Sequence, residues 1–351
     1  MIKLIKTSLI AIALVALVAP NLQAQNTIEE QLLNEFRALR RSVEGISRTF
    51  DQVIKRVDDL MWREMVGDIA HVDKVRLTGP ARVSEPDPNN KFATNPVQFA
   101  SYVIIPRSVD PNKKYPLIVL PHDGASGGFS TFYAHIVREL IAQEYIVIAA
   151  EYRNGTGGAT NEVGLENDDI LASRDHMVDT YPIVDPTRVG IMGWSRGGML
   201  SMMGVLTYAD KYNCAFAGVP VPDPLNQFAS PVVTSNSGAP NQIVPQRNAG
   251  RTPSNFAQNL NKPLLIHTNM NGEEVYVKEM QSMVDALRRH NKTFEYKVLE
   301  DFSGGESTNW IDAGKNTEIR YGIHKFLEKY LNPPKPFKSH ADMRKAAYRF
   351  N

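Results

Sequence analysis

Short apolar runs alternate with longer amphipathic segments from Phe99 onward, and this alternation constrains the fold more than any other feature of the chain. Apolar runs with few charges are typical of strands that are buried on both faces, as in a parallel sheet covered by its crossover helices. The pattern therefore predicts an α/β fold with a mostly parallel central sheet and helices on both faces. The expected strands are 102–105, 117–120, 146–150, 189–192, 215–219, 264–266 and 294–299, and the expected helices are 132–143, 167–180, 196–208, 276–290 and 316–331.

Length and composition agree with one large globular domain and a small appendage. The chain has 351 residues, of which 42% are apolar and 22% are charged. The formal net charge is +1 and basic residues do not cluster along one stretch, so nothing predicts binding of nucleic acid. Cys214 is the only cysteine, which excludes an intrachain disulfide. It lies in an apolar strand-like run, and we expect a packed, unreactive thiol there.

The first 24 residues have the features of a cleavable signal peptide. Lys3 and Lys6 precede an apolar run of 11 residues over 9–19, and Ala24 provides a small residue at the expected cleavage site. The run is too short to cross a bilayer, which needs about 20 residues. The sequence therefore predicts a secreted or periplasmic protein without a stable membrane anchor, and the alternative is an uncleaved N-terminal anchor.

Residues 25–66 are predicted to form a long helical segment that precedes the α/β domain. Its apolar residues repeat at alternating intervals of three and four, which is a heptad pattern: Phe36, Leu39, Val43, Ile46, Phe50, Val53, Val57 and Leu60. Two interpretations remain open. The helix either forms a homo-oligomeric coiled coil through residues 28–61 or folds back along its own domain.

The stretch from Val189 to Gly198 carries the clearest chemical signal. An apolar strand runs into Gly193-x-Ser195-x-Gly197, and a helix follows. In this context the serine lies on a sharp turn with its hydroxyl exposed, and the two glycines allow close backbone packing. Ser195 is therefore the predicted nucleophile. The amide of Arg196, at the start of the helix, is the predicted first donor to an oxyanion.

A second oxyanion donor is expected from the loop that follows an earlier strand. The strand over 117–120 leads directly into a turn that contains His122, Asp123 and Gly124. Asp123 is the predicted donor in this turn. His122 is a further candidate for a hydrogen bond to the oxyanion, and a purely structural role for it remains equally open.

Several motifs together resemble the catalytic domain of the prolyl oligopeptidase family of serine peptidases, within the α/β-hydrolase superfamily, and more closely its short secreted members without a β-propeller. The resemblance implies an α/β-hydrolase fold over residues 67–334. The composition of the residues that follow, Pro-rich and then basic, separately predicts a basic tail over 335–351 that extends over the surface. The resemblance also implies hydrolysis of peptide or ester bonds through an acyl-serine. The motifs that carry it are 58–62, 72–80, 151–153, 185–190, the serine turn and 264–269.

The sequence departs from this family at two expected members of the catalytic triad. The resemblance places the acid at Gly272, with Glu273 adjacent as a substitute acid, and places the histidine at Glu306. Imidazole, with a pKa near 6.5, accepts and returns a proton at neutral pH, whereas a carboxylate near 4.3 is a weak base. His267 lies at a strand end and is expected to be a hydrogen-bonded structural residue.

Two hypotheses follow for the function. The first is a secreted serine hydrolase of prolyl oligopeptidase type, with weak or altered activity towards a peptide or small ester. The alternative is a catalytically inactive protein that serves as a binding or assembly module. The sequence contains no spaced cluster of metal ligands and no phosphate-binding glycine loop, so no metal or cofactor is predicted.

Overall fold

The computed structural model describes residues 32–43, 45–46, 49–50, 52–81, 95–124, 128–153, 165–220, 252–269, 274–299 and 317–347. The predicted signal peptide lies outside these residues. The chain divides into two compact units, Met1–Val57 and Asp58–Asn351. In the first unit, the described residues 32–43, 45–46, 49–50 and 52–57 are all helical.

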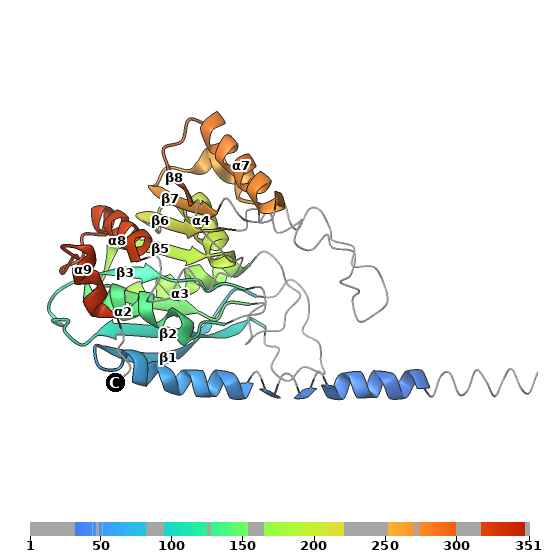
Figure 1. Cartoon of the computed structure of the whole chain (residues 1–351). Helices are drawn as coiled ribbons and strands as arrows, with labels where there is room; N and C mark the ends of the chain where they lie inside the picture. Colours follow the sequence, from blue (N-terminus) through green and yellow to red (C-terminus); the bar gives the residue numbers. More distant parts are fainter. Residues whose placement is uncertain are drawn as a thin grey trace, which may run out of the picture. The chain divides into compact units, whose positions relative to one another are not determined.

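An eight-stranded sheet organises the second unit, in the order β1-β2-β4-β3-β5-β6-β7-β8 (Figure 1). The three strands β1, β2 and β4 pair in antiparallel fashion, and all pairs from β4 to β8 are parallel. The predicted α/β fold with a mostly parallel sheet is confirmed. The strands are β1 (Ala70–Thr78), β2 (Gln98–Pro106), β3 (Tyr115–Val119), β4 (Ile146–Ala150), β5 (Val184–Trp194), β6 (Cys214–Gly218), β7 (Leu264–Asn269) and β8 (Glu295–Leu299).

Helices cover both faces of the sheet, and each face has its own apolar cluster. One cluster contains buried side chains of the helical residues 58–66, of α2 and of α8. The other contains side chains of α3, α4, α7 and the short helix η2. The helices that follow the strands are α2 (Ala134–Ala142), α3 (Glu166–Thr180), α4 (Arg196–Thr207), η2 (Pro253–Asn259), α7 (Glu274–Arg289) and α8 (Thr317–Leu331).

The second unit begins at Asp58, before the predicted domain start at residue 67, because the helical residues 58–66 pack into its core. The Trp62 ring is fully buried and stacks on Phe129, with ring centroids 5.0 Å apart. Asp58 accepts hydrogen bonds from the amide and the hydroxyl of Thr131, at 2.8 and 2.5 Å. The Tyr102 hydroxyl on β2 donates to the Asp59 carboxylate. These contacts fix the chain ahead of β1 to the first face of the sheet.

The C-terminal tail packs on the domain, where the sequence led us to expect a basic segment extended over the surface. It forms the short helices α9 (His340–Met343) and η4 (Arg344–Ala346). Met343 is fully buried, and the Phe337 ring lies edge-on to that of His324 in α8, with centroids 5.4 Å apart. Polar contacts add to this packing: Arg138 donates to the carbonyl of Ala346 at 2.8 Å, and Lys335 forms an ion pair with Glu144 at 2.7 Å.

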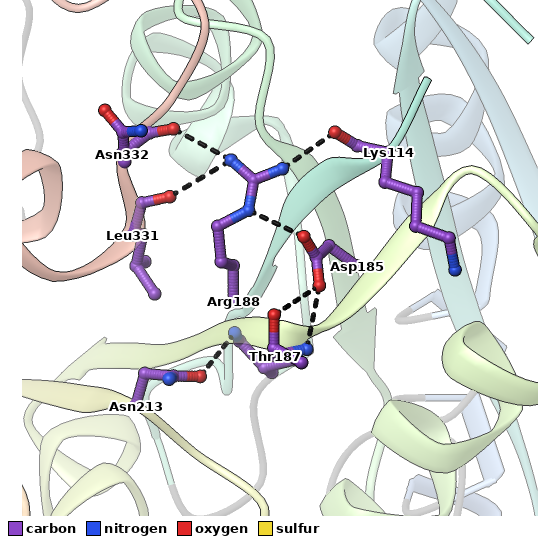
Figure 2. Close-up of polar contacts among 8 residues, drawn as sticks. Lys114, Asp185, Thr187, Arg188, Asn213, Leu331 and Asn332 are labelled. Atoms are coloured by element: carbon purple, nitrogen blue, oxygen red, sulfur yellow. Dashed lines mark hydrogen bonds and ion pairs between the residues drawn. The ribbon is translucent and has the colours of Figure 1, made fainter. Parts of the chain in front are cut away.

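Arg188 joins three parts of the chain at the amino end of β5 (Figure 2). Its guanidinium donates to Asp185 at 2.8 Å, to the carbonyl of Lys114 just before β3 at 2.7 Å, and to the carbonyl of Asn332 at 2.9 Å. A longer bond of 3.4 Å reaches the carbonyl of Leu331, the last residue of α8. The positive charge therefore lies at the carboxyl end of that helix, where the helix dipole favours it.

We expect Arg188→Ala to lower the free energy of unfolding by about 2 to 3 kcal/mol, because charged hydrogen bonds to three segments are lost together. Arg188→Lys should lose part of that stability, since lysine keeps the charge but cannot reproduce the planar fork. Urea unfolding followed by circular dichroism measures both. Equal stability of the alanine variant and the wild type would show that these bonds contribute nothing net.

Candidate active site

Ser195 occupies a sharp corner between a strand and a helix. β5 ends at Trp194, α4 begins at Arg196, and Ser195 between them has φ 53° and ψ −121°. Its amide donates to the carbonyl of Gly218 on β6 at 2.8 Å, and its carbonyl accepts from the amide of Met199 at 3.0 Å. A positive φ is costly for a residue with a side chain and persists only where the surrounding contacts enforce it. The partly exposed Ser195 is thus held in the geometry of a nucleophile elbow.

Two glycines make this corner possible, because neither position has room for a side chain. A Cβ added to Gly197 would lie 2.2 Å from the carbonyl oxygen of Pro121, and one added to Gly193 would lie 2.8 Å from the same oxygen. Both distances are far below van der Waals contact. The loop after β3 therefore lies directly against the elbow.

Arg196 has separate roles for its backbone and its side chain. Its amide opens α4, where no earlier helical carbonyl accepts from it and the positive end of the helix dipole lies. Its guanidinium donates to the buried Glu166, the first residue of α3, at 2.6 Å, and lies 5.9 Å from the centre of the Tyr152 ring. The side chain is thereby held by its own neighbours. Glu166 lies 30 positions before its partner in the sequence, and no local motif points to it.

His122 is enclosed in the loop that faces the elbow. It is fully buried, its ring stacks on Tyr152 with centroids 4.2 Å apart, and its Nδ1 lies 2.8 Å from the carbonyl oxygen of Asp123. Its Nε2 lies 3.9 Å from the Glu151 carboxylate. Burial lowers the pKa of the His122 imidazole, although the nearby Glu151 acts in the opposite direction.

The amide of Asp123 already has an acceptor, since it donates to the Tyr133 hydroxyl at 2.7 Å. That hydroxyl in turn donates to the Asp123 carboxylate at 2.8 Å. An oxyanion would have to displace the Tyr133 hydroxyl before it could accept a hydrogen bond from the Asp123 amide. The next residue, Gly124, has φ 75°, and within the described part of the chain its amide donates to no acceptor.

All eight histidines of the chain lie among the described residues. No hydrogen bond joins any of them to Ser195, whose side chain has no hydrogen-bond partner in the described part of the structure. The other three predicted site residues, Gly272, Glu273 and Glu306, lie outside the described residues. Among the described residues there is no group of three or more potential metal ligands. The described helices include none that is long and apolar enough to cross a membrane.

His267, which ends up deep in the sheet, differs from the expectation of a hydrogen-bonded residue. It is 1% exposed, and neither ring nitrogen has a hydrogen-bond partner. Its ring lies edge-on to Phe216 at 5.1 Å, and Phe216 in turn lies edge-on to Trp194 at 5.2 Å. Burial lowers the pKa of His267 to about 3, and the nearby charge of Lys297 acts in the same direction.

This pKa makes stability depend on pH. The unfolded chain binds a proton on His267 near pH 6.5 and the folded chain near pH 3, so stability is lost as pH falls through that window. His267→Leu should reduce the fall in unfolding free energy between pH 7 and pH 5 by about 2 kcal/mol. His290→Leu, at an exposed histidine, is the matched control. Denaturant unfolding at both pH values measures the difference, and an unchanged fall in the His267 variant would contradict it.

Among known proteins, the chain is similar to peptidases. Dipeptidyl aminopeptidase BIII of Pseudoxanthomonas mexicana is 27% identical over 234 residues, which cover 59% of this chain and 33% of that protein. Dipeptidyl-peptidase 5 of Porphyromonas gingivalis is 30% identical over 236 residues, which cover 62% and 33%. The chain thus spans about a third of the length of these relatives. They are peptidases by name, and nothing in the similarity favours the inactive alternative.

Solved structures with the α/β-hydrolase fold match most of the chain. A puromycin-hydrolyzing peptidase of Mycobacterium tuberculosis superposes with a TM-score of 0.57 at 21% identity, covering 75% of this chain and 39% of that one. An acylaminoacyl peptidase of Pyrococcus horikoshii gives a TM-score of 0.57 at 16% identity, covering 80% and 45%. The prolyl oligopeptidase family model matches residues 132–331, which are more than half of the 351 residues. With its serine corner and its sheet order, the chain belongs to the prolyl oligopeptidase family.

Proposed function

We propose that this chain is a secreted serine hydrolase that cleaves short peptides or small esters through an acyl intermediate on Ser195. The observation that carries the proposal is the corner at Ser195, where a positive φ of 53° is enforced by the packing of Gly193 and Gly197 against the next loop. Strain of this kind costs about 1 to 3 kcal/mol and accumulates at functional sites.

The proposed chemistry begins when Ser195 Oγ attacks the substrate carbonyl carbon and the carbonyl oxygen becomes negatively charged. The amide of Arg196 is one donor to that oxygen, since it opens α4 beside the nucleophile. The amide of Gly124 is the second proposed donor, because the neighbouring amide of Asp123 is already bonded to Tyr133. Donors fixed before the reaction stabilise the developing charge without reorganisation. Collapse of the intermediate releases the leaving group and leaves the acyl-serine, which water then hydrolyses.

The base is the unusual part of the proposal. The resemblance assigns the histidine position to Glu306 and the acid position to Gly272, with Glu273 beside it. We propose that the Glu306 carboxylate accepts the Ser195 proton. A glutamate with a pKa near 4.3 is a weak base at neutral pH, and it returns its proton to a leaving amine poorly. We therefore expect slow turnover and faster cleavage of esters with good leaving groups than of peptides.

The cellular site of action is proposed on the sequence alone. The basic and apolar features of residues 1–24 favour export and removal of that segment, which gives a secreted or periplasmic enzyme. The only cysteine, Cys214, is fully buried and takes part in no disulfide. The fold therefore does not depend on the redox state of the compartment.

Turnover of p-nitrophenyl esters and of short peptide p-nitroanilides between pH 4 and pH 8 tests the proposal. We expect slow ester hydrolysis that disappears in Ser195→Ala and falls in Glu306→Gln. Thermal unfolding of each variant shows that the fold is intact. Ester hydrolysis that survives unchanged in Ser195→Ala would refute the assignment of the nucleophile.

A further inference from the structure

The helix of the first unit carries an apolar seam that the described residues leave open to solvent. We define the seam as the residues at its heptad positions a and d. In the first unit these side chains are between 50% and 70% exposed: Phe36, Leu39, Val43, Ile46, Phe50, Val53 and Val57. Leu60, the next seam residue, belongs to the second unit and is 70% exposed.

From this seam we infer that the helix pairs with the same helix of a second copy of the chain, in a parallel two-stranded coiled coil. A helix with an exposed apolar stripe gains most of its stability from a partner that covers the stripe. The repeat of 3.5 residues is that of two helices that wind around each other.

The residues beside the seam favour a second copy in parallel orientation. In a parallel pair, each residue at heptad position g faces the residue five positions later at position e of the partner helix. Glu35 is at g and Arg40 is at e, so the first such contact joins opposite charges in both directions across the pair. Three further pairs follow, and each contains at most one charged residue: 42 with 47, 49 with 54, and 56 with 61. No like charges oppose the pairing.

The seam residues are of mixed kind. Val43 and Val57 at position a with Leu39 and Leu60 at position d form the combination that favours dimers, whereas Phe36 and Phe50 at position a and Ile46 and Val53 at position d depart from it. Gly45 lies away from the seam at position c, and a Cβ added there would meet no atom within 4 Å. The glycine weakens the helix without touching the contact surface.

The subunit mass of the purified full chain, measured by sedimentation equilibrium, tests the inference. We expect two chains for the wild type and one chain for the seam variant Ile46→Gln with Val53→Gln. The matched control, Arg41→Gln with Lys55→Gln, changes two residues at position f on the opposite side of the helix and should remain a dimer. A single-chain wild type would overturn the inference, as would a seam variant that stays dimeric. Either result would show that the seam is covered by its own chain or left unpaired.

Disulfide trapping tests the parallel register independently. Cys214 is fully buried, so one added cysteine is the only accessible thiol among the described residues. Val43→Cys places two thiols in the same layer of a parallel pair, and mild oxidation should link the chains. Arg41→Cys, on the outer side, should remain unlinked. A dimeric Val43→Cys chain that fails to cross-link would exclude the parallel arrangement.

Discussion

Gly272→Asp combined with Glu306→His is expected to raise kcat/KM for ester hydrolysis by about 10²- to 10⁴-fold, the usual contribution of a positioned general base. The double change restores an imidazole that accepts and returns the serine proton near neutral pH, and a carboxylate that orients it. Initial rates with p-nitrophenyl esters at pH 7 measure the gain. Peptide substrates should gain more, because their leaving amine needs a proton.

Controls separate the restored triad from unrelated effects. Glu306→His alone should give a smaller gain, since an unoriented imidazole adopts the wrong tautomer or position more often. The double change in a Ser195→Ala background should give no gain. If the wild-type chain already hydrolyses the ester as fast as the double variant, then Gly272 and Glu306 do not limit its activity.

Gly197→Ala is expected to lower the free energy of unfolding by about 3 kcal/mol and to abolish reaction at Ser195. The new Cβ would lie 2.2 Å from the backbone oxygen of Pro121, which cannot rotate away as a side chain could. Urea unfolding and ester hydrolysis measure the two effects. The control is Gly322→Ala in α8, where the nearest atom to the added Cβ is the end of Lys297 at 3.7 Å. That variant should be more stable by about 0.5 to 1 kcal/mol, because alanine favours a helix. A Gly197 variant with wild-type stability would contradict the tight corner.

The seven strands and five helices predicted from the apolar pattern match β2 to β8 and the five longer helices of the second unit with small shifts at their ends. The sequence did not reveal β1, because that strand carries charges on much of its length, among them Asp73, Lys74 and Arg76. It lies at the edge of the sheet beside β2. Charged side chains are usual on an edge strand, since they discourage pairing with other chains.

The strand-to-helix corner at Ser195 could be predicted because its motif is local. The strand, the glycines and the helix start lie within ten consecutive residues from Val189 to Gly198. The pair formed by Arg196 and Glu166 could not be found in this way, since its members are 30 positions apart and no repeat connects them. The same holds for Tyr133, whose hydroxyl accepts a hydrogen bond from the amide of Asp123. Contacts between distant segments depend on the folded arrangement.

Labelling with a fluorophosphonate probe between pH 4 and pH 8, followed by mass spectrometry of the digested protein, decides most directly whether Ser195 is a working nucleophile. Such a probe needs an activated serine next to oxyanion donors but no protonated leaving group. We expect one added phosphonyl group on the peptide that contains Ser195, and none in Ser195→Ala. A folded wild-type chain that stays unlabelled over the whole pH range would contradict a catalytic Ser195.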